Sequence, residues 1–199
     1  MLRAAAVLAL VTLSSAAVAK PAGGFTADVS NGVAIQLGDN DYRNFADPSY
    51  QFGLRAGWDF HLTKLLGIGP EVGLDAAAVT VDSSTFGNVP SRFARVKGLF
   101  GARLTVHFSI GYFFVRVMFG VDHTEGSFGN SLLRVNLSST GFAFVPETGV
   151  LFKVWRMLHA GFTLGFPVGT NDFGAAYVGT VKSFNGIDIT LQGTVGVHL

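Results

Sequence analysis

The chain has 199 residues, of which 49% are hydrophobic and only 14% are charged, and its formal net charge is +1. This length accommodates one domain with a targeting segment, and the near balance of charge gives no indication of a nucleic-acid partner. The chain has no cysteine, which excludes disulfides and thiolate metal sites as sources of stability.

Residues 1–19, MLRAAAVLALVTLSSAAVA, have the pattern of a secretory signal peptide. A basic residue, Arg3, precedes an apolar run that ends before small residues, and Ala17 and Ala19 have the spacing of a cleavage site. The run is shorter than the roughly 20 residues that span a bilayer as a helix. We therefore expect a signal peptide over 1–19 and one β-barrel domain over 20–199.

The rest of the chain alternates apolar and polar residues with a period of two, which is the pattern of β-strands. Strands are expected, in chain order, over 25–37, 50–62, 66–78, 94–108, 112–122, 142–152, 158–168 and 187–199. The clearest is YQFGLRAGWDFHLTK, residues 50–64, in which every second residue from Tyr50 to Leu62 is apolar and the residues between them are polar or glycine. A further short strand over 175–183 would extend the last hairpin.

The predicted connections alternate in length. Long connections are expected over 39–49, 82–92, 125–138 and 169–184, and short ones over 63–65, 109–111 and 153–157. This alternation is typical of outer-membrane barrels, which have short periplasmic turns and longer extracellular loops. Aromatic residues cluster near both ends of the strands, as interfacial girdles do. The fold class predicted is all-β, an eight-stranded antiparallel up-and-down transmembrane β-barrel.

The signal sequence, the eight alternating strands, the loop asymmetry and the terminal TLQGTVGVHL resemble the small outer-membrane β-barrel family of the outer membrane protein A transmembrane domain and the opacity-type adhesins. The resemblance covers the whole mature chain. It implies a monomer in the outer membrane of a Gram-negative bacterium, in contact with lipid and lipopolysaccharide and recognised by the barrel assembly machinery. Such proteins usually end in Phe, whereas this chain ends in Leu199.

The inward row of the predicted strands carries charges of both signs. We expect Arg55, Glu71, Arg103, Arg116 and Glu147 to form an ion-pair network that fills the lumen, because buried charges need partners. The interior of an eight-stranded barrel is about wide enough for side chains to fill it. The expected function is thus structural or surface-interacting. A narrow pore for small solutes or ions is the alternative, and a secreted barrel of lipocalin type with an apolar ligand ranks below it.

Four of the five histidines share the inward phase near short turns: His61, His107, His159 and His198. A hydrated polar rim at the periplasmic mouth is expected, with a transition-metal site or a proton-sensitive gate as alternatives. No cofactor is assigned. An enzyme is not expected either, because the adjacent Asp122 and His123 point to opposite faces of a strand and do not pair as acid and base.

Overall fold

The computed structural model describes residues 23–37, 48–81, 91–129, 134–172 and 183–199. The expected signal peptide and nearly all of the expected strand over 175–183 lie outside these residues. None of the described residues forms a helix long and apolar enough to cross a membrane.

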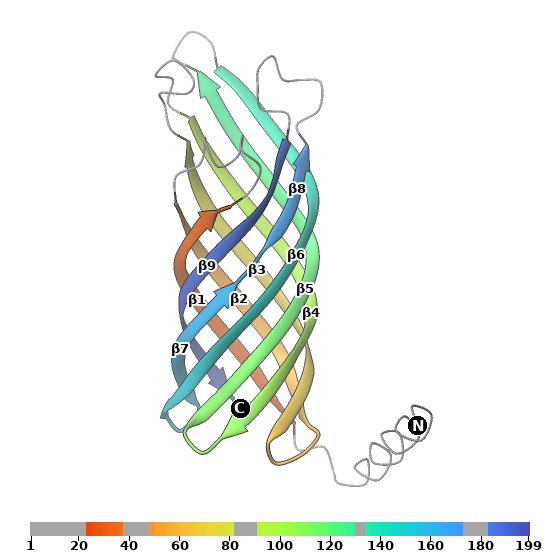
Figure 1. The fold of residues 1–199 in the computed structure, drawn as a ribbon, viewed down its shortest axis with the longest axis vertical. Coiled ribbons are helices and arrows are strands. Elements are labelled where there is room, and N and C mark those ends of the chain that lie inside the picture. The colour runs from red at the N-terminus through yellow and green to blue at the C-terminus, as the bar shows by residue number, and fades with distance from the viewer. Residues whose placement is uncertain (1–22, 38–47, 82–90, 130–133, 173–182) are drawn as a thin grey trace, which may run out of the picture.

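The described residues form one closed antiparallel sheet (Figure 1). Strands that are adjacent in the sequence pair with each other, except the seventh and the eighth, and the first strand also pairs with the last from Thr26↔His198 to Gln36↔Asp188, which closes the ring. Closure leaves no sheet edge exposed along the wall that the described residues form. The strands are β1 (Gly23–Gln36), β2 (Ser49–His61), β3 (Leu66–Val81), β4 (Ser91–Phe108), β5 (Gly111–Gly129), β6 (Arg134–Trp155), β7 (Leu158–Gly165), β8 (Val168–Asp172) and β9 (Ser183–His198).

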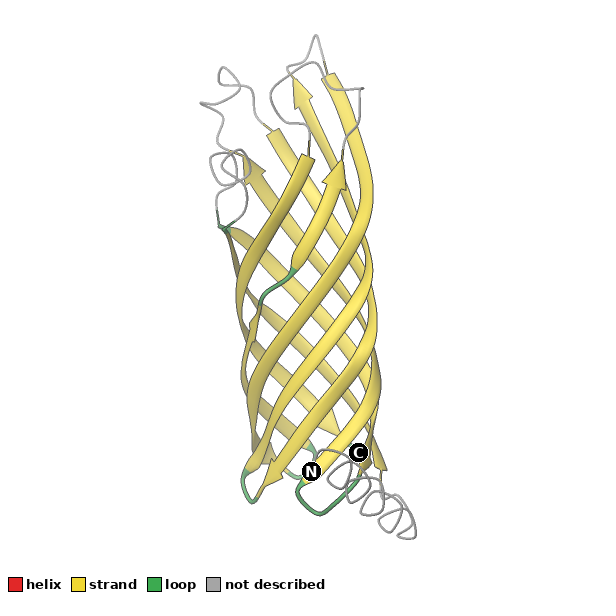
Figure 2. Ribbon diagram, turned by 45° about the vertical axis from the view of Figure 1, so that its right-hand side comes forward, coloured by secondary structure: helices red, strands yellow, loops and turns green. Residues whose placement is uncertain are grey.

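The strands β7 and β8 share one position in the wall, between β6 and β9, so the nine strands in the described part of the chain make a ring of eight. The break between them falls at Phe166 and Pro167, and Figure 2 shows it partway along the wall. Proline has no N–H to donate to the ladder. The neighbouring backbone keeps its bonds: the Phe166 N–H donates to the Pro146 carbonyl at 2.9 Å, and the Asp188 N–H donates to the Pro167 carbonyl at 2.9 Å. The predicted strand over 158–168 is therefore interrupted at Phe166 and Pro167, and β8 continues to Asp172, so the connection expected from residue 169 is wrong for residues 169–172.

The two rows of each strand face different environments. The outer row is apolar and exposed, for example Leu54, Val72, Phe100, Phe162 and Leu191. The inner row holds most of the buried polar and charged side chains. This is the reverse of a soluble barrel, and only lipid gives such an exterior a favourable environment. The predicted fold class, an eight-stranded antiparallel transmembrane barrel, is confirmed.

The connections differ at the two ends of the barrel. The turns 62–65, 109–110 and 156–157 lie at the same end as the C-terminus (Figure 2), and we call this the short-turn end. The predicted long connection over 125–138 is wrong, because β5 and β6 continue to pair through Glu125↔Ser138 as far as Gly129↔Arg134. The glycines and serines of residues 125–138 favour a loop locally, but cross-strand hydrogen bonding extends the hairpin into this segment.

Candidate functional site

A buried layer of charge crosses the middle of the lumen. Its basic members, Arg55, Arg103 and Arg116, project from β2, β4 and β5. Its acidic members project from β1, β3 and β6. All of these side chains are at most 5% exposed, and the acids are Asp28, Glu71, Asp75 and Glu147. Charges buried this deeply are tolerated when they are paired and hydrogen-bonded.

Arg55 connects two carboxylates. Its guanidinium holds Asp75 in a two-point contact, with Nη1 to Oδ1 at 2.5 Å and Nη2 to Oδ2 at 3.0 Å. The same Nη2 also donates to Oε1 of Glu147 at 3.0 Å. Arginine suits this role because its planar guanidinium presents several donors in a fixed fork.

Arg103 and Arg116 share the remaining two carboxylates. Arg103 Nη1 lies 3.2 Å from Asp28 Oδ2 and 3.4 Å from Glu71 Oε1, while its Nη2 donates to the Thr26 hydroxyl at 2.6 Å. Arg116 contacts the same Glu71 and Asp28 oxygens at 3.3 Å and 3.4 Å. Its Nε lies 3.3 Å from Glu147 Oε2. Glu147 therefore contacts both Arg55 and Arg116, and this joins all seven charges into one network.

The network spans the barrel from wall to wall. In the ring order, β2 stands four positions from β6, and β1 stands four positions from β5. Four positions is half of a ring of eight, so Arg55 to Glu147 and Arg116 to Asp28 join opposite walls. These contacts can form only where side chains meet near the barrel axis.

Gly73 makes room for this arrangement. A Cβ at this position would lie 2.7 Å from Cδ of Arg55 and 2.9 Å from its Nη1. The Arg55 side chain crosses the space that a larger residue would fill. Small residues in the inner row thus let the long charged side chains of neighbouring strands reach the axis.

A second charged layer lies nearer the end opposite the short turns. Arg95 contacts Asp122, and its Nη1 reaches Asp188 Oδ2 at 2.9 Å. Since β4 and β9 are also four positions apart in the ring, the Asp188 contact again joins opposite walls. Lys97 is buried, and its register partners on β3 and β5 are Asp75 and Asp122.

Apolar side chains fill the lumen on both sides of the central layer. One cluster consists of Tyr112, Phe114 and Leu151, and the other of Leu99, Met118, Ala143 and Val145. The guanidinium carbon of Arg116 lies 4.3 Å from the centroid of the Phe114 ring, a cation–π distance. The interior therefore alternates ionic and apolar layers and is not uniformly polar.

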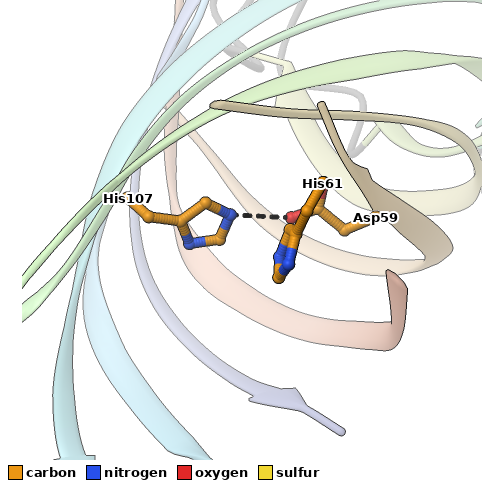
Figure 3. A group of neighbouring side chains, drawn as sticks. All are labelled: Asp59, His61 and His107. Carbon is orange, nitrogen blue, oxygen red and sulfur yellow. Dashed lines mark hydrogen bonds and ion pairs between the residues drawn. The ribbon is translucent and has the colours of Figure 1, made fainter. Parts of the chain in front are cut away.

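The histidines gather at the short-turn end. The rings of His61 and His107 lie 4.8 Å apart, and His198 lies 5.8 Å and 5.7 Å from them. Nε2 of His107 also lies 3.2 Å from Oδ2 of Asp59 (Figure 3). His159 lies at the edge of this group, with its ring 6.4 Å from that of His198 and 5.1 Å from that of Tyr112.

The structure brings the five residues expected in the lumen network together in the central charged layer. It brings the four expected mouth histidines together at the short-turn end. The sequence alone did not assign Asp28, Asp75 or Asp188 to ion pairs. Each has the inward phase, which is a usable signal, but their partners depend on strand register. Asp122 is fully buried, whereas His123 is half-exposed and contacts Thr140 and Glu125, so the two face opposite sides.

No protein-family model matches the chain, and no curated protein sequence matches it. Solved structures do match. A major outer membrane protein from Thermus thermophilus is similar with a TM-score of 0.55 at 10% identity, over 89% of this chain and 100% of that one. Ail, the attachment invasion locus protein of Yersinia pestis, has a TM-score of 0.45 at 10% identity, over 89% and 97%. Neisserial surface protein A has a TM-score of 0.44 at 13% sequence identity, over 88% of this chain and 96% of that one.

At these sequence identities the likeness concerns the fold alone. It rests on the Thermus structure, whose TM-score is above 0.5. The expected resemblance to the small outer-membrane β-barrels holds at that level. The closed ring, the lipid-compatible exterior, the charged interior and this likeness together identify the chain as an integral β-barrel with the fold of the small outer-membrane barrels of Gram-negative bacteria.

Proposed function

We propose that this protein is a sealed, non-enzymatic barrel of the outer membrane, which serves as a rigid scaffold and presents its long hairpin at the cell surface. One observation carries the proposal: Arg55 and Glu147, from opposite walls, meet at 3.0 Å. A side chain that crosses the axis occupies the route that ions and solutes would take.

The surrounding layers support a sealed lumen. The central network is buried, and apolar clusters lie on either side of it. An ion entering from either end would meet an apolar cluster before reaching the central charged layer. Fixed charges of both signs also hold one another in place, since separating a buried pair is costly.

A narrow pore is the second candidate, and one observation favours it. Thr190, Gln192 and Thr194 form a continuous buried polar row along β9. Such a row would line a file of water if the arginines moved aside. Three contacts of Arg103 and Arg116 with the shared carboxylates, at 3.3 to 3.4 Å, are longer than those of Arg55 with Asp75.

The surface role rests on the β5–β6 hairpin, whose paired strands reach Gly129 and Arg134 (Figure 1). Asn136, Ser138 and Thr140 are exposed along it. In the proposed orientation the short-turn end faces the periplasm and the hairpin faces outward. The proposal includes a monomer that contacts lipid and lipopolysaccharide through its apolar exterior and is inserted by the barrel assembly machinery.

Two measurements test the proposal. Because the chain has no cysteine, a Ser138→Cys variant carries one thiol. We expect a membrane-impermeant maleimide to label it on intact cells, whereas a Thr63→Cys variant at a short turn should be labelled only after the outer membrane is permeabilised. In liposomes, the wild-type barrel should leave the ion permeability at the protein-free level. Ion flux proportional to the protein content would instead support the pore.

A further inference from the structure

We propose that Asp59, His61 and His107 bind one divalent transition-metal ion of the zinc class at the short-turn mouth of the barrel. Each side chain offers one ligand atom, and these atoms lie within 4.8 Å of one another. Figure 3 shows that the three side chains converge from two strands, with Asp59 and His61 on β2 and His107 on β4.

The unsatisfied ligand atoms point to a bound cation. Asp59 is 1% exposed, yet its Oδ1 has no hydrogen-bond partner among the described residues, and the same holds for the buried Nε2 of His61. A buried polar atom without a partner is costly and is rare in folded proteins. One cation would satisfy the carboxylate oxygen and the imidazole nitrogen together.

A glycine on the intervening strand leaves room for the Asp59 ligand. On β3, which separates β2 from β4, a Cβ at Gly67 would clash with Oδ1 of Asp59. Any larger residue at position 67 would displace the carboxylate.

The three ligand atoms suit zinc and similar divalent transition metals. Two imidazole nitrogens and one carboxylate oxygen are common ligands for Zn²⁺ at about 2.0 to 2.2 Å. Tetrahedral ligands then lie roughly 3.3 Å apart, so the side chains must draw together by about 1.5 Å at most. The side chain of His107 is 19% exposed, and this exposure gives an ion access from the mouth. His198 lies beside these ligands, with its ring 5.8 Å from that of His61 and 5.7 Å from that of His107.

Binding of zinc chloride to the untagged, refolded barrel in nanodiscs tests the proposal by calorimetry, with cobalt absorption as a second readout of the ligand geometry. We expect one ion per chain. His61→Gln and His107→Gln should each weaken binding by more than about tenfold, since loss of an outer-shell partner alone typically costs 10- to 100-fold. Gly67→Ala should weaken it as well, by moving Asp59.

His123→Gln is the matched control, because His123 lies at the other end of the barrel and contacts Glu125 and Thr140. It should bind zinc as the wild type does, and so should His159→Gln, whose residue is outside the cluster of three. Heat-modifiable mobility on gels verifies that each variant is folded. The proposal is overturned if the wild type shows no saturable 1:1 binding, if His61→Gln and His107→Gln bind normally, or if His123→Gln loses binding equally.

Discussion

Arg55 and Glu147 meet across the full width of the barrel, with Nη2 and Oε1 3.0 Å apart, although they are 92 residues apart in the sequence and lie on opposite walls. The contact works as a cross-link because both side chains are buried and each has a second ionic partner, Asp75 for Arg55 and Arg116 for Glu147. The stability of the barrel should therefore depend on this pair more than on any exposed pair.

Replacing Glu147 with glutamine should lower the free energy of unfolding by about 3 to 5 kcal/mol, because Arg55 and Arg116 would each lose a buried countercharge. Urea unfolding of the barrel in lipid vesicles measures this. Glu125→Gln is the control, since that side chain is 69% exposed in its contact with His123. A change within about 0.5 kcal/mol is expected there. Equal effects of the two substitutions would contradict the cross-link.

Gly73→Ala should destabilise the barrel by about 1 to 3 kcal/mol, the usual cost of overpacking, because its Cβ would push the Arg55 guanidinium out of place. Gly98→Ala is a matched control on the neighbouring strand, where an added Cβ meets none of the described residues within 4 Å. Thermal unfolding of the two variants in the same detergent makes the comparison. A neutral Gly73→Ala would mean that the position of Arg55 is not fixed.

A charged residue on the apolar exterior should destabilise the barrel more, the closer it lies to the middle of the bilayer. Val115 is exposed on β5, one residue from Arg116 of the central layer, so Val115→Arg would place a cation near the middle of the bilayer. The expected loss is about 2 to 4 kcal/mol of unfolding free energy. Asn136→Arg on the β5–β6 hairpin should cost far less. If both variants unfold at the same urea concentration, Val115 does not lie near the middle of the bilayer.

Both tryptophans lie near the short-turn end and point outward, with Trp58 44% and Trp155 71% exposed. Tryptophan favours the membrane interface, where its ring is partly apolar and its N–H remains hydrated. Lipids brominated close to the headgroup should quench their fluorescence more strongly than lipids brominated near the chain ends. Single-tryptophan variants assign each signal. No quenching by either lipid would show that this rim lies outside the bilayer.

The sequence predicted the wall of the barrel well because a period of two needs only local information. The alternation from Tyr50 to Leu62 places Leu54 outside and Arg55 inside, and the structure agrees. Ion-pair partners could not be predicted in the same way, because a pair such as Arg95 and Asp188 depends on ring closure and strand register. The continuation of the β5–β6 hairpin from Glu125↔Ser138 to Gly129↔Arg134 was missed, since glycine disfavours strands locally and serine favours turns, while cross-strand pairing stabilises the strands there.

Single-channel conductance of the refolded protein in a planar bilayer tests the sealed lumen most directly. We expect no steps above background for the wild type. We expect reproducible steps for an Arg55→Ala/Glu147→Ala double variant, in which both sides of the cross-link are shortened and no buried charge of this pair is left alone. Steady wild-type steps with the same conductance in the double variant would contradict the sealed lumen, because ions would then pass through the barrel without meeting the Arg55–Glu147 contact.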